Sequence, residues 1–261
     1  MKKIVLVLFL SMFLYSFQNQ KIENLMGEDE FQTYNKLLDK IFTNEQMDIV
    51  EILTTLKNNG LLDLFFNKPR IIHTKFIFSP RNDIIKTKIL NDSLKSLGYY
   101  YFYPSDTIKT DKNFILNIEF KSEHYIDPVL LIQEMKSRGC YVKDVDREND
   151  VFSYIFDCED SFIKEAVDLT NKNKRYINIK GNYWINPLEF TKIFIKTKKI
   201  DYWHPSVWFY DSKLNLINNI KINRKVVKLL LDIPPGCEYI KITDIYSAEN
   251  FKRGIIVKGL K

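Results

Sequence analysis

The pattern of apolar and polar positions begins with a short run at the N-terminus. Lys2 and Lys3 precede an unbroken apolar stretch over residues 4–10, and Ser16 supplies a small residue shortly after it. A basic head, an apolar middle and a small residue are typical of a secretory signal peptide. The run is shorter than the ~20 residues that a membrane-spanning helix needs. We therefore expect residues 1–17 to be a signal peptide, the alternative being an uncleaved anchor.

The next segment, residues 18–70, has a helical pattern. Apolar residues recur every three or four positions over residues 28–66, which favours two helices with one apolar face each. Thr43 followed by Gln46 has the spacing of a capping box, and Gly60 is placed to end a helix. The segment is therefore expected to form a helical hairpin, which either packs on the following domain or docks a partner.

Residues 71–170 alternate between strand and helix patterns. Apolar and polar side chains alternate from Phe114 to Lys121, as in a strand with one buried face. Asp127 followed by Pro128 is typical of a helix N-terminus. The predicted order is βαββαβ, a ferredoxin-like module. Its four strands are expected at residues 71–79, 99–103, 114–121 and 140–145.

Two more elements are expected in this domain. Residues 151–156 continue the strand pattern after a polar turn, and we expect them to add an edge strand. Asp160 or Ser161 is then expected to cap a helix that ends near Leu169. In element order alone, the module resembles glycan-binding domains of the sporulation-related type and ring-building domains of secretion systems. That resemblance assigns no site residue.

The last segment, residues 171–261, contains short strand patterns separated by turn residues. Strands at this spacing favour a β-sandwich, here expected to be jelly-roll-like. The complete prediction is an α+β chain with a helical hairpin, a ferredoxin-like module and a C-terminal β-sandwich. The expected strands of the sandwich cover residues 176–180, 191–197, 207–210, 214–222, 226–233, 239–243 and 254–258.

Composition adds a charge asymmetry to this picture. Hydrophobic residues make up 45% of the chain and aromatic residues 14%, which is enough for a core and excludes global disorder. Residues 171–261 contain 18 Lys and Arg but 7 Asp and Glu, whereas residues 17–170 contain 19 and 26. The basic C-terminal part indicates an anionic partner such as wall glycan, lipid head groups or an acidic protein. The alternative is a solvated lysine-rich surface, and export argues against nucleic acid.

The cysteines predict one disulfide. Cys140 and Cys158 flank two extended runs, and they lie opposite each other if the intervening hairpin is centred on Asn149. Facing residues of an antiparallel pair are close enough for a disulfide bond. We expect a Cys140–Cys158 bond, the alternative being two buried thiols. Cys237 has no partner in this scheme and is expected to be buried after a turn, or to pair between molecules.

Catalytic signatures are missing from the sequence. It has no Gly-x-Ser-x-Gly elbow, no phosphate-binding glycine loop and no His-Glu-x-x-His helix, the motifs of three common enzyme classes. His73, His124 and His204 are far apart in sequence and are expected to be structural. Glu123 and His124 with Asp127 could form a metal corner, but Asp127 is better explained as a helix cap. No cofactor and no metal are predicted.

One aromatic set in the basic part stands out. It consists of Trp184, Tyr202, Trp203, Trp208 and Tyr210. Flat aromatic faces stack on the C–H faces of sugars and on cations, and nearby lysines attract acidic glycans. The alternative is core packing, because alternate side chains of residues 207–210 must face a sandwich interior. Trp203, in a loop, is expected to be the most exposed member.

These features predict an exported, non-enzymatic envelope protein, periplasmic or extracellular. The first hypothesis is a scaffold or accessory of an envelope assembly, such as a secretion or motility machine, that acts through protein–protein contacts. The second is a cell-wall or glycan-binding protein that uses the aromatic set. The third is an enzyme of a type that the missing motifs do not reveal. No transmembrane segment is expected after signal removal, because no second long apolar stretch follows.

Overall fold

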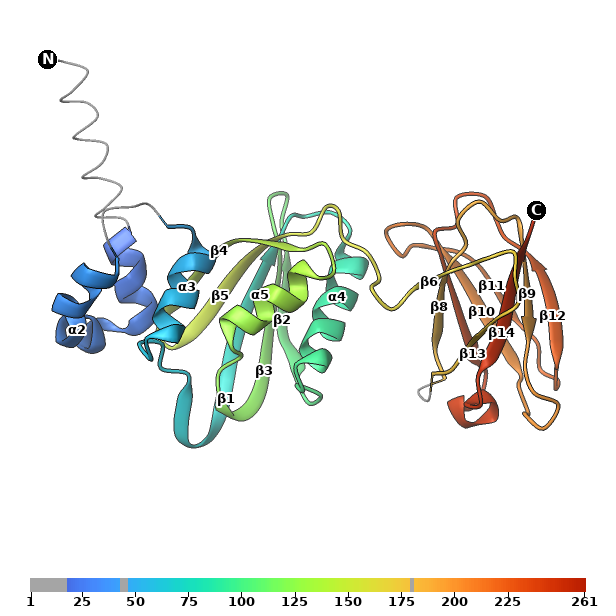
Figure 1. Cartoon of the computed structure of the whole chain (residues 1–261), viewed down its shortest axis with the longest axis horizontal. Coiled ribbons are helices and arrows are strands. Elements are labelled where there is room, and N and C mark those ends of the chain that lie inside the picture. Colours follow the sequence, from blue (N-terminus) through green and yellow to red (C-terminus); the bar gives the residue numbers. More distant parts are fainter. Residues whose placement is uncertain (1–17, 43–46, 179–180) are drawn as a thin grey trace, which may run out of the picture. The chain divides into compact units, whose positions relative to one another are not determined.

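The computed structural model describes residues 18–42, 47–178 and 181–261. The expected signal peptide and the expected capping box at Thr43 and Gln46 lie outside these residues. The chain is a mixed α+β protein with N-terminal helices, a five-stranded sheet with helices, and two further sheets in the C-terminal part (Figure 1). It divides into two compact units, Met1–Ser161 and Phe162–Lys261, which are described separately.

Helices open the N-terminal unit. A helix over residues 18–26 is followed by α2 (Glu28–Ile41) and α3 (Ile49–Asn58). The side chain of Asp48 accepts hydrogen bonds from the backbone of Val50 and Glu51, both at 2.9 Å. The Glu51 carboxylate in turn accepts from the backbone of Asp48, which completes a capping box. Among the described residues no helix is both long and apolar enough to cross a membrane.

The five-stranded sheet has the strand order β2-β3-β1-β5-β4. Its elements follow one another as β-α-β-β-α-β, with one further strand at the end. Asp127 caps α5 by accepting from the backbone of Val129 and Leu130, as the Asp-Pro signal predicts. The elements are β1 (Phe65–Phe78), α4 (Asp83–Ser96), β2 (Tyr103–Lys109), β3 (Phe114–His124), α5 (Pro128–Lys136), β4 (Tyr141–Glu148) and β5 (Val151–Asp157).

The strand after the hairpin is internal, so the expectation of an added edge strand is wrong. β5 pairs in parallel with β1, with Phe76 opposite Tyr154, and pairs antiparallel with β4. Its side chains Phe152, Tyr154 and Phe156 are buried. This explains the placement, because three large aromatic side chains on one face are better covered between two strands than at an edge. The edges are β2 and β4.

Two other expected elements are also corrected. The tyrosine run at residues 99–103 is mostly irregular, and strand β2 begins only at Tyr103. The hydroxyl of Tyr99 instead reaches the backbone oxygen of Tyr125, at 3.2 Å. No helix follows Asp160 or Ser161; the chain is irregular there until β6 (Val167–Asp168). Apolar residues recur there at helical spacing, but Ile163 is buried and its backbone N–H donates to the hydroxyl of Tyr239, at 3.4 Å, instead of taking part in a helix.

The sheet has one covered and one open face. Side chains that alternate with the buried ones along β1, β3 and β5 are partly or fully exposed, and α4 and α5 lie on one side of the sheet (Figure 1). On the open face, four isoleucines pair in register across four strands. We call this the isoleucine row; it consists of Ile108, Ile115, Ile77 and Ile155.

The predicted disulfide is confirmed. Cys140 and Cys158 are bonded, and their Cα atoms lie 4.2 Å apart. Both are buried, at 0% and 1% exposure. A disulfide is consistent with a protein outside the cytoplasm, where thiols are not kept reduced. Cys237 is a buried free thiol whose Sγ lies 3.4 Å from the backbone oxygen of Tyr239.

The C-terminal unit consists of two sheets and a shared core. One sheet has the order β11-β10-β13-β8-β6 and the other β12-β9-β14-β7. Ile185 and Val207 from the first sheet, with Ile195 and Val257 from the second, belong to one buried cluster. The strands are β7 (Lys174–Tyr176), β8 (Tyr183–Asn186), β9 (Lys192–Lys196), β10 (Pro205–Tyr210), β11 (Leu216–Lys221), β12 (Lys228–Asp232), β13 (Tyr239–Asp244) and β14 (Ile255–Leu260).

Candidate functional site

The alternation along β10 divides its aromatic residues between core and surface. Val207 and Phe209 are fully buried, whereas Trp208 and Tyr210 keep partial exposure. Successive side chains of a strand point to opposite faces, so Trp208 and Tyr210 lie on the outer face of this sheet. Of the two packing alternatives for residues 207–210, the structure therefore selects the one that leaves Trp208 and Tyr210 outside the core.

Strand register places a second tryptophan beside this pair. Lys241 of β13 is opposite both Trp208 of β10 and Trp184 of β8, and Asn219 of β11 is opposite Trp208. Facing residues share one face of the sheet. Four side chains thus form a continuous row across four neighbouring strands: Trp184, Lys241, Trp208 and Asn219. These residues are far apart along the chain, so no single stretch of it shows the row.

Contacts between these side chains fix their arrangement. The rings of Trp184 and Tyr210 are 5.8 Å apart, and the ammonium of Lys241 lies 5.6 Å from the Trp184 ring centre. Lys221 lies 5.0 Å from the Trp208 ring centre. Both lysine distances are in the range of cation–π attraction. We call Trp184, Trp208, Tyr210, Lys221 and Lys241 the aromatic–lysine face.

Further bonds hold the face rigid. The indole nitrogen of Trp208 donates to the hydroxyl of Ser206, at 2.8 Å. Burial raises the pKa of the Tyr210 phenol still further above physiological pH. Rings that are already oriented lose little conformational entropy on binding. The face can therefore offer flat apolar surfaces with positive charge between them.

Trp203 is not exposed, and the expectation for this residue is wrong. It is 0% exposed and stacks on Phe251, with ring centres 5.9 Å apart. Its indole nitrogen donates to the backbone oxygen of Thr243, at 2.9 Å. A loop position before proline suggested exposure, but this indole finds an acceptor inside the core and so can be buried at little cost.

Tyr202 belongs to neither the row nor the core. It precedes β10, is 63% exposed, and has the Lys225 ammonium 4.1 Å from its ring centre. The pair has the same chemistry as the aromatic–lysine face. The structure does not join it to the register row of Trp184, Lys241 and Trp208.

The three histidines have separate surroundings. His73 approaches the Glu119 carboxylate at 3.3 Å, and His204 lies 3.9 Å from Asp244. His124 lies beside Tyr125 and Tyr99. Within the described residues, no group of three or more His, Cys, Asp or Glu side chains is arranged to hold a metal ion.

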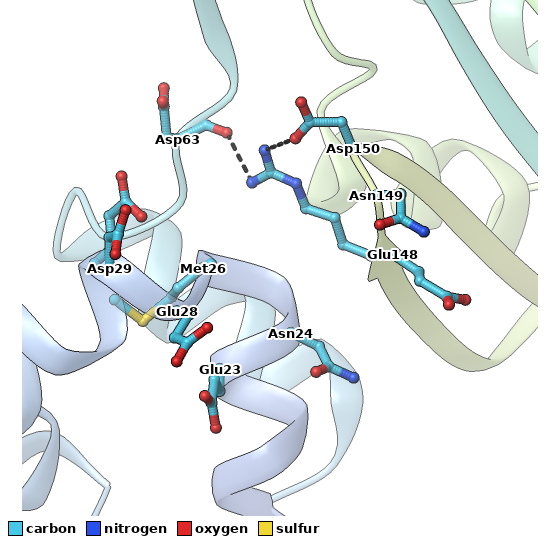
Figure 2. Close-up of a pocket in the computed structure, with 12 residues that line it drawn as sticks. Glu23, Asn24, Met26, Glu28, Asp29, Asp63, Glu148, Asn149 and Asp150 are labelled. Atoms are coloured by element: carbon cyan, nitrogen blue, oxygen red, sulfur yellow. Dashed lines mark hydrogen bonds and ion pairs between the residues drawn. The ribbon is translucent and has the colours of Figure 1, made fainter.

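A polar pocket of about 660 Å³ lies in the N-terminal unit (Figure 2). Its one basic lining residue, Arg147, donates to the Asp150 carboxylate at 3.0 Å and lies near the backbone oxygens of Leu25 and Asp63, at 3.4 and 3.5 Å. The same guanidinium lies 5.0 Å from the Tyr125 ring centre. Arg147 thus joins the helical segment to the sheet. The acidic lining residues are Glu23, Glu28, Asp29, Glu30, Asp63, Glu148 and Asp150.

Comparison with known proteins does not identify a family. No family model matches the chain, and no curated protein matches its sequence. Among solved structures, the chain is similar to the secreted serine protease VesC from Vibrio cholerae at 5% sequence identity and a TM-score of 0.23. The match covers 75% of this chain and 43% of the protease chain, so this chain spans less than half of that protein. A similarity at this level supports no statement about fold or activity.

Proposed function

We propose that this chain is an exported, non-enzymatic binding protein that holds anionic envelope glycan on the aromatic–lysine face. The observation that carries the proposal is the register row, in which Lys241 separates Trp184 and Trp208 on one outer sheet surface. Indole rings stack on the C–H faces of sugar rings, and a lysine between them pairs with sugar carboxylates.

The charge of the C-terminal part supports the same ligand. Residues 171–261 carry an excess of 11 basic over acidic side chains, which raises the local concentration of anionic polymers near the surface. In this proposal, residues 1–17 are a signal peptide, residues 18–70 a helical hairpin, residues 71–170 a ferredoxin-like module and residues 171–261 a jelly-roll-like β-sandwich. The location is the periplasm, with secretion to the exterior as the alternative.

Co-sedimentation with purified cell-wall sacculi tests the proposal. We expect the mature protein to bind at low and moderate salt, because stacking persists when charge is screened. Trp208→Ala is expected to weaken binding about fivefold or more, since an aromatic contact contributes about 1 kcal/mol beyond its buried area. Lys241→Gln should weaken binding mainly at low salt.

Two variants on the same unit serve as matched controls. Tyr202→Ala removes an exposed aromatic ring outside the row, and Lys228→Gln removes a lysine from the other sheet. Both are expected to leave sedimentation unchanged. Equal losses in Trp208→Ala and Tyr202→Ala, or binding abolished in wild type by moderate salt, would count against a glycan-binding face.

A second candidate function, docking of an envelope protein, is supported by the isoleucine row. Ile108 and Ile155 are 41% and 38% exposed on the open face of the five-stranded sheet. Adjacent exposed aliphatic residues are typical of protein contact surfaces. A photo-cross-linking residue at position 108 is expected to capture a partner in intact cells, and Ile155→Lys should abolish that capture. The same residue at position 101, where Tyr101 is 94% exposed, is the control.

A further inference from the structure

A second pocket in the N-terminal unit has a different character from the acidic one. It has a volume of about 720 Å³ and is formed by the end of α3, the start of β1 and the segment that joins β3 to α5. This is within the range of small-molecule sites, about 300–1,000 Å³. We call it the His124 pocket. No residue of the aromatic–lysine face lines it.

Apolar side chains make up most of its wall and mouth. Leu62 and Leu64 are buried at 8% and 6% exposure, and Leu97 is partly buried. At the mouth, Phe65 is 74% exposed and Leu130 is 44% exposed. Covering exposed side chains of this size with an apolar ligand is favourable, because it removes apolar surface from water. The pocket therefore favours a ligand with an apolar body.

Aromatic rings in the lining favour an aromatic ligand over an aliphatic one. The rings of Phe65 and Tyr99 lie 5.9 and 5.8 Å from the His124 ring, both in tilted or edge-on orientation. Tyr125 also lines the pocket. Aromatic groups favour this edge-to-face packing over parallel contact, so a planar aromatic body can continue the arrangement.

The hydrogen bonds of His124 define what its ring offers to a ligand. Nδ1 lies 2.9 Å from the backbone oxygen of Tyr125, which can only accept, and 3.1 Å from the hydroxyl of Tyr99. That hydroxyl can donate to the same backbone oxygen, at 3.2 Å, so the tautomer with the hydrogen on Nδ1 satisfies every one of these contacts. In the neutral ring, Nε2 then has a free lone pair and acts as an acceptor. Within the described part of the chain, no hydrogen bond to this Nε2 is found. A ligand that carries an N–H or O–H group would satisfy it.

Charge excludes an acidic ligand. The ammonium of Lys57 is 2.5 Å from the Asp127 carboxylate, so the one lysine of the pocket is already neutralised. Asp63 contributes a further negative charge to the lining. A carboxylate brought here would face two like charges and one cation that is already paired, which is unfavourable. An acidic ligand is therefore disfavoured, and a charged group of either sign would lose its hydration among the apolar side chains of the wall, so a neutral ligand is favoured.

We propose that the His124 pocket binds a small, neutral aromatic molecule whose N–H or O–H group donates to Nε2 of His124. The class follows from three properties of the site: apolar and aromatic walls, one acceptor without a partner, and no unpaired cation. The pocket is a binding function in addition to the proposed glycan face, and it does not depend on it.

The experiment is a fluorescence titration with two matched probes. N-phenyl-1-naphthylamine is neutral, aromatic and carries one N–H, and its emission rises in apolar surroundings. N-methyl-N-phenyl-1-naphthylamine lacks that hydrogen. The full-length mature protein is expected to bind the first probe several-fold more tightly than the second, because one hydrogen bond contributes about 1 kcal/mol. His124→Phe should abolish this difference while it keeps a ring at the position.

Variants at the mouth separate the pocket from unspecific binding. Phe65→Ser is expected to weaken both probes about tenfold, and Tyr101→Ser, a matched loss of an exposed ring outside the pocket, should change neither. Thermal unfolding of each variant confirms that it folds. Equal affinity of wild type for the two probes, or equal effects of Phe65→Ser and Tyr101→Ser, would overturn the proposal.

Discussion

Cys140 directly precedes β4 and Cys158 directly follows β5, and a β-bulge in β4 brings the two cysteines opposite each other. At the turn, Glu148 pairs with Val151, and this register alone would place Cys140 opposite Glu159. A bulge between Val142 and Asp144 adds one residue to β4 and shifts the pairing. The disulfide therefore depends on a two-residue turn and a bulge together, whereas the expected hairpin centred on Asn149 has a symmetric turn and no bulge.

Loss of this disulfide is expected to lower the free energy of unfolding by about 3 kcal/mol, the chain-entropy value for a loop of this size. The measurement is a urea titration of the double variant Cys140→Ser, Cys158→Ser beside wild type. Cys237→Ser is the control, because Cys237 forms no disulfide. A midpoint equal to that of wild type would show that the bond contributes nothing to stability.

Trp203→Ala is expected to destabilise the protein by about 3–5 kcal/mol. The substitution leaves a cavity in the core and removes the hydrogen bond that the indole donates to the Thr243 carbonyl. Thermal unfolding followed by near-ultraviolet circular dichroism measures the effect. Trp208→Ala, on the outer face, should cost far less. If the two variants unfolded at the same temperature, the assignment of core and surface would be wrong.

Tyr154→Phe is expected to raise the free energy of unfolding by about 1 kcal/mol. The hydroxyl of Tyr154 is buried and has no hydrogen-bond partner among the described residues, so its removal relieves a desolvation cost. Tyr125→Phe is the contrasting control, because that hydroxyl accepts from Arg70 at 2.5 Å. It should destabilise. The comparison uses urea midpoints, and a loss of stability in Tyr154→Phe would contradict the prediction.

Stability is expected to fall between about pH 9 and pH 12. Burial raises the pKa of Tyr99 from 10.0 to about 12 and that of Cys237 from 9.0 to about 11. The unfolded chain therefore loses these protons first, and stability present below pH 9 is lost as pH rises through the folded pKa values. Lys86 acts in the opposite sense, because burial lowers the pKa of its ammonium.

The measurement for this prediction is the urea midpoint at each pH. Tyr99→Phe should flatten the decline above pH 10, whereas a phenylalanine at Tyr101, which is 94% exposed, should not. A midpoint that stays constant to pH 12 would contradict the assigned burial.

Arg147→Met is expected to destabilise the N-terminal unit, because the guanidinium donates to Asp150 and lies over Tyr125. Burial opposes ionisation of Asp150, but the hydrogen bond and charge of Arg147, together with smaller contributions from Tyr125 and Arg70, lower the pKa of that carboxyl. Stability from this pair is present above pH 4 and is lost as pH falls. Acid unfolding curves should therefore differ less between pH 2 and pH 5 in the variant than in wild type.

Local patterns predicted some elements well. The alternation from Phe114 to Phe120 gives the buried face of β3, and the cap at Asp127 gives the start of α5. Both signals are local, since they depend on backbone periodicity and on one side chain that bonds its own helix end. β8 was missed although Tyr183 to Asn186 alternates in burial, because four residues are too short a pattern to recognise.

Non-local features are not predictable from the local sequence pattern. Trp184, Trp208 and Lys241 are brought together by strand pairing, which no spacing in the chain encodes. The exposure of Trp203 was misjudged for the same reason, because its acceptor, Thr243, is forty positions away. The aromatic composition of the site was visible in the sequence, whereas its division into core and surface was not.

The internal position of β5 also has a consequence for biosynthesis. β1 and β4 cannot become part of one sheet until residues 151–157 are available to pair between them. A nascent chain that ends before Val151 therefore holds the three-stranded sheet β2-β3-β1, with β1 as an unpaired edge, and β4 as a strand without a partner. Formation of the N-terminal unit is delayed until its last strand emerges, and contacts between distant positions then close it in a single late step.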